Sequence, residues 1–218
     1  MKWRAEFKPH EITATEMKTE IEMGKIYIPG FDKYGRPIVV MKPSKETGAS
    51  SYETQLRFLV YMLERASNLM SEGVHQLIWL IDFSDFSTSG APPISQCIET
   101  LKILANHFPE RLAHCFFMDT PWLFKFFWAT ISTFVNQKTA DKVVIVTNSA
   151  SKQDKQQTMS KYFDLDFLEK GFGGESEYIY DSNEYFNTLS EQDEKIKAKF
   201  EKKLKKCLSK ENIELKVE

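Results

Sequence analysis

The chain has 218 residues, of which 42% are hydrophobic and 28% are charged, with a formal net charge of −2. This length and composition predict one soluble domain with a single sizeable core. No apolar run reaches 18 residues, and charges follow the first residue at once, which argues against a transmembrane helix and a signal peptide. Three widely spaced cysteines indicate neither a disulfide framework nor a zinc site, so we expect a cytoplasmic protein.

The first half of the chain predicts a helix, a hairpin, a second helix and a strand. Apolar residues at helical spacing predict a helix over residues 12–23, ended by Gly24. Two extended runs beside the turn at residues 32–37 predict a hairpin. A long amphipathic helix follows the loop at residues 44–51, and its apolar face holds Leu56, Leu59, Val60, Leu63 and Met70. The apolar run at 77–81 predicts a strand covered on both faces.

The second half alternates helices with strands. It predicts a helix over 94–107, a strand over 113–118, an apolar helix over 122–135 and a buried strand over 142–146. Ser149 is expected to cap a polar helix that runs to about residue 162, and residues 171–174 form a glycine-rich turn. This order predicts an α/β fold with a central, mostly parallel sheet and flanking helices.

The C-terminal segment is basic, while the rest of the chain is acidic. Residues 195–210 contain eight Lys and one Glu, so this segment carries +7 and the remainder −9. Ile196, Phe200, Leu204 and Leu208 recur every four residues. A helix with such a stripe binds a membrane surface or a partner, or it is simply a solvated charged helix, and the pattern leaves both open.

The apolar helix at 122–135 is unusual because its only charge is Lys125. Residues 116–135 contain eight aromatic side chains. At about 1.5 Å per residue the helix is about 20 Å long, too short for a bilayer core of about 30 Å. It is either a buried core helix or a helix with protein on one face and a removable apolar ligand or a membrane on the other.

Motifs of the common enzyme classes are absent, and the four histidines lack metal-ligand spacing, so we expect neither an enzyme nor a metal or cofactor. Charged and polar groups flank the apolar helix: Glu110 and Arg111 on one side, Thr139 and Lys142 on the other. Arg offers a fork that matches a phosphate, and Lys adds a point charge. The four residues are candidates for one anion site, although, taken alone, solvation of each at the surface is the favoured explanation.

Several segments, in order, resemble the CRAL-TRIO lipid-binding domain. The run His107-Phe108-Pro109-Glu110-Arg111-Leu112 and the run from Phe116 to Phe124 are similar to two of its signatures. Residues 32–37, 79–82, 136–142 and 168–174 resemble further motifs, so the resemblance covers about residues 25–180. It implies an apolar lipid pocket closed by a gate helix, here residues 122–135. The residues expected at the gate and pocket are Trp122, Phe124, Phe126, Phe127, Trp128, Ile131 and Phe134.

The resemblance to the phosphatidylinositol-transfer branch implies a headgroup site made of Arg4, Glu110, Arg111, Thr139 and Lys142. Leu77 and Trp79 stand where some transfer proteins have hydroxyl residues for phosphatidylcholine, which argues against that lipid. Asp85, Asp119 and Thr120 also depart from the family pattern. The N-terminal helical region of the family is represented only by a remnant at residues 1–24, before a lipid-binding domain at 25–190 and a basic tail at 191–218.

The resemblance therefore implies a monomeric carrier that binds a phospholipid, phosphatidylinositol above all, and visits membranes transiently. It implies no nucleic acid partner and a cytoplasmic, peripheral location. Two alternatives stay open: a carrier of a neutral hydrophobic ligand such as a sterol, retinoid or tocopherol, and a signalling scaffold that transfers nothing. The scaffold would use its surface and basic helix in place of a pocket.

Overall fold

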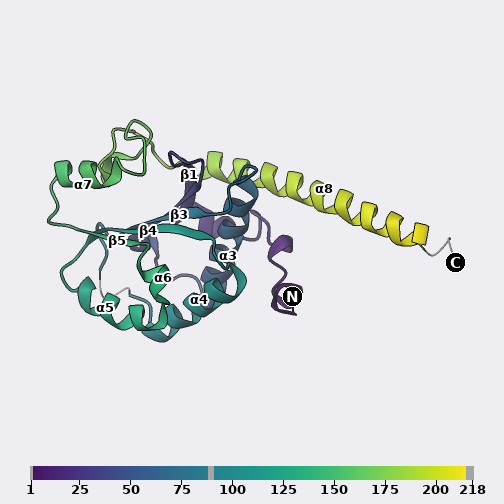
Figure 1. The fold of residues 1–218 in the computed structure, drawn as a ribbon, viewed down its shortest axis with the longest axis horizontal. Coiled ribbons are helices and arrows are strands. Elements are labelled where there is room, and N and C mark those ends of the chain that lie inside the picture. Colours follow the sequence, from purple (N-terminus) through teal and green to yellow (C-terminus); the bar gives the residue numbers. More distant parts are fainter. Residues whose placement is uncertain (1, 88–90, 215–218) are drawn as a thin grey trace.

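The computed structural model describes residues 2–87 and 91–214, with side chains as far as residue 198. It is an α/β fold built on a five-stranded sheet in the order β1-β2-β3-β4-β5 (Figure 1). The strands are β1 (Ile26–Phe31), β2 (Pro37–Met41), β3 (Leu77–Asp82), β4 (Leu112–Thr120) and β5 (Val143–Thr147). The first two strands form the expected antiparallel hairpin, and the other pairs are parallel. The predicted mostly parallel sheet is therefore confirmed.

The sheet has helices on both faces. The larger elements are α3 (Tyr52–Leu69), α4 (Ile94–His107), α5 (Phe124–Ile131), α6 (Gln137–Ala140), α7 (Lys152–Met159) and α8 (Ser182–Glu214). Shorter helical pieces are α1 (Lys2–Phe7), η1 (Pro9–Glu11), α2 (Lys18–Glu22), η2 (Pro43–Lys45), η4 (Ser132–Phe134) and η5 (Lys170–Phe172). Figure 1 shows α4, α5 and α6 on one side of the sheet and α7 on the other.

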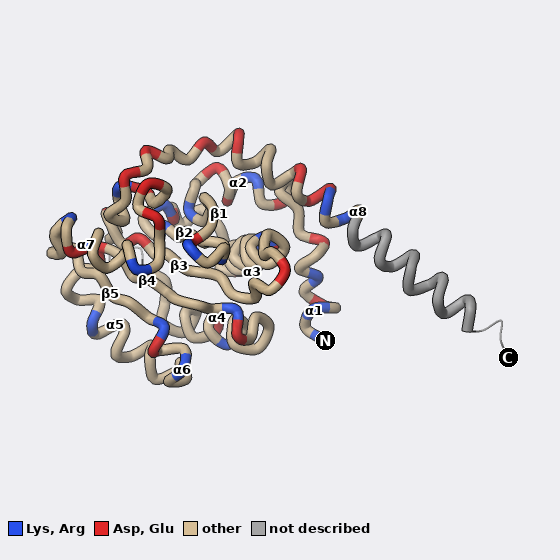
Figure 2. Tube along the Cα trace, turned by 45° about the horizontal axis from the view of Figure 1, so that its top comes forward, with Lys and Arg blue, Asp and Glu red and all other residues tan. Residues whose placement is uncertain are grey.

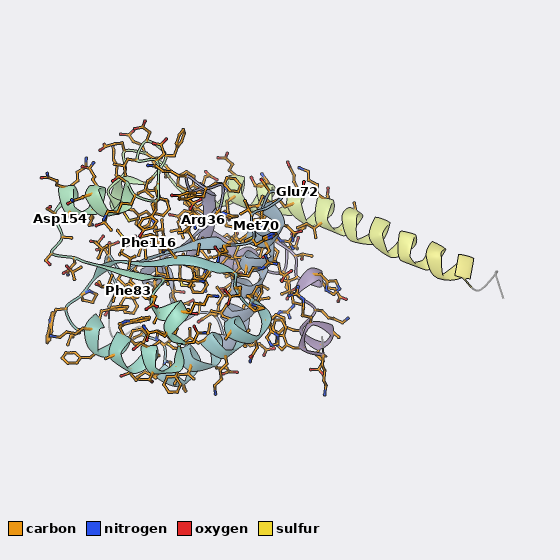
Figure 3. The ribbon with its side chains drawn as sticks, viewed as in Figure 1. Arg36, Met70, Glu72, Phe83, Phe116 and Asp154 are labelled. Carbon is orange, nitrogen blue, oxygen red and sulfur yellow. The ribbon has the colours of Figure 1, made fainter. Side chains whose placement is uncertain are left out.

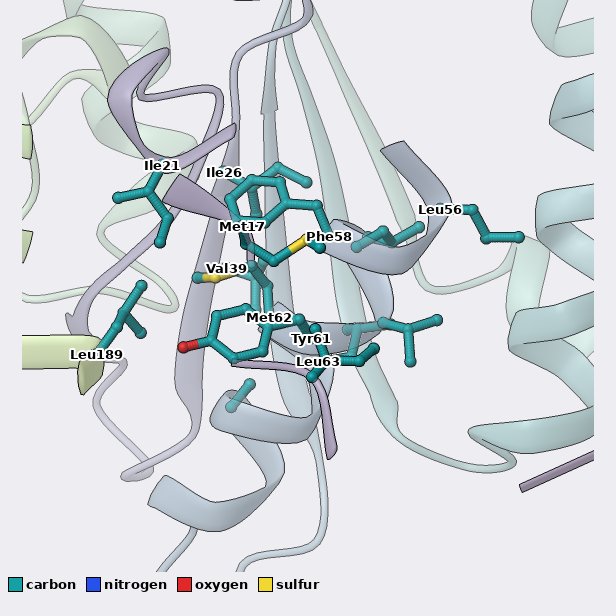
Figure 4. Packing of buried hydrophobic residues seen from close by; sticks show 14 of the residues in the cluster. Met17, Ile21, Ile26, Val39, Leu56, Phe58, Tyr61, Met62, Leu63 and Leu189 are labelled. Carbon is teal, nitrogen blue, oxygen red and sulfur yellow. The ribbon is translucent and has the colours of Figure 1, made fainter. Parts of the chain in front are cut away.

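Strand side chains that point alternately to the two faces of the sheet contribute to two separate apolar cores. Val39 and Trp79 pair across the sheet and pack into a cluster with α3, whose members include Phe58 and Met62 (Figure 4). The next residues along the strands point to the other face of the sheet. Phe116 is one of them, and it packs into a second cluster beneath α7 and the segment that follows α7. Strand side chains alternate between the faces, so each central strand supplies both cores.

Several element bounds differ from the sequence prediction. The first helix was expected over residues 12–23, but α2 begins only at Lys18. Ile12 and Ala14 are buried in the α3 core, and the Ala14 N–H donates to Asp193 at 2.6 Å. Ile12 has an extended backbone with ψ 131°, so the chain packs on this core without being helical there, and the prediction for this stretch was wrong.

The N-cap residue of α7 and the burial of β5 also differ from the sequence prediction. Ser151, not Ser149, caps α7, where its hydroxyl accepts the Asp154 N–H at 3.1 Å and the Asp154 carboxylate accepts in return. The strand β5 was expected to be buried, yet only Val146 is buried and Ile145 is 41% exposed. As the outermost strand, β5 receives less cover from the helices than β3 does.

The long helix α8 begins on the domain and then leaves it. Leu189 packs into the α3 core near Ile21 of α2 (Figure 4). The C-terminal half of α8 extends away from the domain (Figure 1). The expected division at residue 190 falls inside α8, which is unbroken there, and the division stays a prediction. Of the apolar stripe in the basic tail, Phe200, Leu204 and Leu208 lie outside the described side chains.

Candidate functional site

The apolar helix of the sequence is present, but it is shorter than expected. The structure has α5 over Phe124–Ile131 and then the 3-10 turn η4, in place of one helix over 122–135. The hydroxyls of Ser132 and Thr133 donate to the carbonyls of Ala129 and Thr130 at 3.3 and 2.8 Å. Such bonds compete with the helical ladder and explain the early end of α5.

The side chains of α5 and its flanks divide into an inner and an outer set. Phe124 and Ile131 are buried, and Phe127 and Trp128 are half-buried. The outer set is exposed by 44–68% and consists of Trp122, Leu123, Phe126 and Phe134. Membership of the outer aromatic residues in a lipid pocket stays a prediction, because they face solvent in this conformation.

Aromatic rings connect α5 to the sheet. Phe124 lies 4.9 Å from Phe117 on β4 and 5.0 Å from Phe83, measured between ring centroids. Trp128 lies 5.6 Å from Phe117. Figure 3 shows Phe83 on this side of the sheet and Phe116 on the other. Ring contacts of this kind hold α5 by dispersion and allow rearrangement at modest cost.

The space beneath α5 is packed differently from the two cores. Buried Ile81, Cys115, Phe124 and Ile131 belong to neither of the two core clusters. No residue of α4 is fully buried, although the helix carries apolar side chains. Ile103 and Leu104 of α4 pack against the α3 core, but the four buried residues between α5 and the sheet lie outside both clusters, which suits a removable apolar ligand.

Two hollows are open at the surface. One, of about 290 Å³, lies beside the start of α5 and is lined by Phe83, Asp85, Asp119 and Pro121 among others. The other, of about 330 Å³, lies on the α7 side between the hairpin and the segment around Phe167. Only the first adjoins the candidate gate.

Four of the predicted headgroup residues gather where β4 and β5 begin. Glu110 and Arg111 end the turn after α4, and Lys142 lies one residue before β5. The Lys142 Nζ donates to the Leu112 carbonyl at 2.6 Å, while its N–H donates to the Thr139 carbonyl at 3.1 Å. Lys142 also contributes to the lowered pKa of Glu110. The structure thus brings Glu110, Arg111, Thr139 and Lys142 to one edge of the sheet.

Arg4 lies elsewhere in the fold. Its Nη2 is 2.7 Å from Glu64 Oε1 on α3, so the guanidinium is engaged by that helix. Trp3, next to it, stacks on His107 with 3.9 Å between ring centroids. Among the described contacts none joins Arg4 to Glu110 or Lys142, and its headgroup role stays a prediction.

Sequence reasoning missed Lys138, which reaches the same site from α6. Its Nζ lies 3.0 Å from both carboxylate oxygens of Glu110. This hydrogen bond and the charge of Lys138 are the two largest causes that lower the pKa of Glu110. Figure 2 shows basic and acidic positions side by side at α6. The sequence did contain one signal for Lys138, which lies directly before Thr139 in the segment 136–142 that resembles a family motif.

Comparison with known proteins identifies the family. The model of the CRAL/TRIO domain matches residues 21–174, most of the chain. This chain belongs to the CRAL-TRIO family. A CRAL-TRIO domain-containing protein of Schizosaccharomyces pombe is 31% identical over 189 residues, which is 87% of this chain and 18% of that protein. The structure of Sfh5 shares the fold, with a TM-score of 0.62, 18% identity and coverage of 84% of this chain and 65% of that one.

Phosphatidylinositol transfer proteins are among the relatives. The protein PDR17 of Saccharomyces cerevisiae is 35% identical over 138 residues, which is 61% of this chain and 39% of that protein. The protein CSR1 of Eremothecium gossypii is 26% identical over 165 residues, which is 74% of this chain and 36% of that protein. The chain thus spans well under half the length of these curated relatives. Its membership in the family makes it a lipid-binding or lipid-transfer domain.

Two findings concern membrane spans and metal sites. No described helix is both long and apolar enough to cross a membrane. Among residues 2–87 and 91–214, no group of three or more His, Cys, Asp or Glu side chains is arranged to hold a metal ion. The expectation that the protein is not an enzyme stays a prediction.

Proposed function

We propose that this chain binds phosphatidylinositol beneath α5 and transfers it between membranes or presents it at one. The observation that carries the proposal is the two-sided character of α5. Its inner side chains, such as Phe124, cover an apolar layer outside both cores, while its outer side chains, such as Phe126, are exposed. A helix that is apolar on both sides matches a gate between an apolar ligand and a membrane.

The energetic reason for such a pocket is the cost of moving lipid tails through water. Two acyl chains contain about 30 methylenes, and at about 0.8 kcal/mol each their exposure costs on the order of 25 kcal/mol. A carrier that keeps the tails beneath α5 avoids that exposure. In our proposal α5 swings away from Phe117 and Phe83 when the lipid enters and packs over its tails afterwards.

The headgroup would lie at the edge formed by Glu110, Arg111, Thr139 and Lys142. A phosphodiester carries one negative charge, which Lys142 and the Arg111 guanidinium can neutralise. The Glu110 carboxylate can accept hydrogen bonds from inositol hydroxyls. Two relatives named as phosphatidylinositol transfer proteins support this lipid. These residue types are also the ones that the resemblance implies for the headgroup site.

The encounter with the membrane would use the outer face of α5. Trp122 is 68% exposed and Phe126 58% exposed, and the Lys125 ammonium lies within 5.7 and 5.1 Å of their ring centroids. Aromatic rings beside a lysine suit the interface between headgroups and acyl chains. We therefore propose a monomer that attaches reversibly and peripherally from the cytoplasm.

The test is lipid loading measured by native mass spectrometry after incubation with phosphatidylcholine vesicles that contain phosphatidylinositol. The wild-type protein should take up one phosphatidylinositol, and Lys142→Ala should lower its loading about tenfold because a charged contact to the phosphate is lost. Lys152→Ala, at an exposed lysine on α7, is the matched control and should load normally.

If the protein takes up a neutral hydrophobic ligand, and Lys142→Ala does not change that uptake, the protein is a carrier of neutral ligands and this proposal is wrong. A protein that stays empty with every lipid would favour the scaffold. In that case deletion of residues 199–218, which keeps Asp193 and its partners in place, should abolish partner binding without changing ligand content.

A further inference from the structure

The indole of Trp79 on β3 is a buried hydrogen-bond donor that the packed domain leaves unpaired. Its Nε1 is shielded from solvent, and no acceptor among the described residues bonds to it. The other described atoms of this kind belong to Glu20 and Arg65, which form ion pairs with Lys25 and Asp193. Nearly all buried polar groups in proteins are paired, because a donor that loses its bonds to water needs a replacement. The Trp79 indole is therefore suited to an acceptor from outside the domain.

Trp79 lies at the border between the α3 core and the apolar layer beneath α5. Val39 of β2 pairs with it on one side and belongs to that core. Cys115 of β4 pairs with it on the other side, and Ile81 is the next residue of β3 on the same face; both are buried outside the two cores. Phe117, the partner of Ile81, contacts α5. Trp79 thus adjoins the space in which the proposed function places the lipid.

The protein groups around the indole are poor acceptors. The backbone carbonyls of β2, β3 and β4 are directed between the strands, in the plane of the sheet, and not toward a side chain on its face. Burial raises the pKa of the Cys115 thiol to about 12, so this neighbour stays a neutral thiol, which is a weak acceptor. A good acceptor for Trp79 must come from the occupant of the apolar layer.

The position of Trp79 along the strand narrows the kind of acceptor. At the proposed headgroup edge the Leu112 carbonyl accepts from the Lys142 Nζ at 2.6 Å. Leu112 pairs with Leu77, and Trp79 follows two residues later on the same face, roughly 7 Å further along at about 3.3 Å per residue. In a glycerophospholipid the ester carbonyls follow the phosphate across the short glycerol backbone, before the chains begin. A phosphate at the headgroup edge therefore brings the ester carbonyls to the level of Trp79.

We propose, on the basis of the function proposed above, that the Trp79 indole donates to an acyl-ester carbonyl of the bound phospholipid and so selects ester-linked over ether-linked chains. A carbonyl oxygen is a strong acceptor, and its bond to Nε1 satisfies the buried donor. An alkyl ether has a methylene group where the ester has its carbonyl. An ether lipid therefore fills the same apolar space and leaves the indole unpaired.

The experiment is a competition between two phosphatidylinositols with chains of equal length, one with ester and one with ether linkages. The full chain is incubated with phosphatidylcholine vesicles that contain both in equal amounts and is then re-isolated. Native mass spectrometry distinguishes the two lipids by mass. The wild type should load the ester lipid about fivefold in preference, and Trp79→Phe should reduce this ratio to less than about twofold, because the ring stays apolar but loses its N–H.

Trp3→Phe is the matched control. Trp3 on α1 is also half-buried and packs against the α3 core, and its ring stacks on His107 with 3.9 Å between the centroids. The same substitution there should leave the ratio of ester to ether lipid at its wild-type value. A loss equal to that of Trp79→Phe would show a general effect of core packing and overturn the proposal.

A second measurement uses the wild-type protein and does not depend on how a variant folds. The chain has four tryptophans, and NMR resolves their indole N–H signals, of which the Trp79 signal is identified by its loss in Trp79→Phe. Loading of the ester lipid should move the Trp79 proton signal downfield relative to loading of the ether lipid. An identical Trp79 signal with both lipids would overturn the proposal.

The remaining outcomes separate this inference from the function on which it rests. If both phosphatidylinositols load equally in the wild type, or if Trp79→Phe keeps the preference, the role of Trp79 is wrong and the transfer function stands. If neither lipid loads, both proposals fail. If cholesterol added to the vesicles loads instead, and Trp79→Phe lowers its loading, the indole binds a hydroxyl of a neutral ligand, which overturns the ester assignment.

Discussion

Asp193 on α8 lies against the buried guanidinium of Arg65 on α3, with 3.2 Å between Oδ1 and Nη1. The Arg65 residue is 2% exposed, and its plane stacks over the Tyr61 ring at 4.6 Å. The same carboxylate accepts from the Tyr61 hydroxyl at 3.0 Å and from the Ala14 N–H at 2.6 Å. One side chain therefore connects α8, α3 and the N-terminal segment.

Replacement of this carboxylate should destabilise the whole domain. We expect Asp193→Ala to lower the free energy of unfolding by about 3 kcal/mol, because it leaves a buried cation without its partner. Urea unfolding followed by circular dichroism measures the change. Glu191→Ala is the control, since Glu191 forms an exposed pair with Lys195 on the same helix at 3.9 Å, and a similar loss there would contradict the assignment.

Exposed aromatic residues on α5 should mediate membrane attachment. The double substitution Trp122→Ala and Phe126→Ala should weaken binding to anionic vesicles about tenfold in a sedimentation assay, because it removes apolar area that enters the interface. Thermal stability should hardly change, since both side chains are exposed. Phe167→Ala, at an 80% exposed residue on the α7 side, should bind like wild type, and an equal loss would assign the membrane contact to that other face.

Titration of Glu110 should depend on Lys138. The hydrogen bond from Lys138 and its charge hold the pKa of Glu110 below its ordinary value. Because the folded pKa is lowered, the stabilisation from this pair is present above the unfolded pKa and is lost as the pH falls through the folded pKa. In Lys138→Gln the pKa should rise toward the ordinary value, as followed by NMR of the Glu110 carboxyl carbon, and an unchanged pKa would show that the pair is absent in solution.

Gly174 should not tolerate a side chain. A Cβ at this position would lie 1.9 Å from the Leu168 carbonyl oxygen, which is backbone and cannot rotate away. Gly174→Ala should therefore lower the free energy of unfolding by about 3 kcal/mol or more in urea. Gly30→Ala meets no atom within 4 Å and should be nearly neutral, so equal effects of the two changes would contradict the packing around Gly174.

Local patterns were sufficient for much of the fold. The helix α4 has the bounds that periodicity predicts, and β3 follows from a continuous apolar run. These elements could be predicted because neighbouring residues carry the signal. The bounds of α2 and α5 could not. Ile12 is extended and packs with Ala14 into the distant α3 core, and the hydroxyls of Ser132 and Thr133 bind carbonyls that a longer helix would use.

The candidate site shows the same division. The sequence by itself determined the residue types of the headgroup site and the apolar character of residues 122–135, because charge and hydrophobicity are properties of each side chain. Only the tertiary structure decided that Lys138 meets Glu110, that Arg4 pairs with Glu64, and which faces of α5 are exposed. Those relations depend on how distant elements pack, and a change of a few ångströms in that packing determines which charges lie within hydrogen-bonding distance.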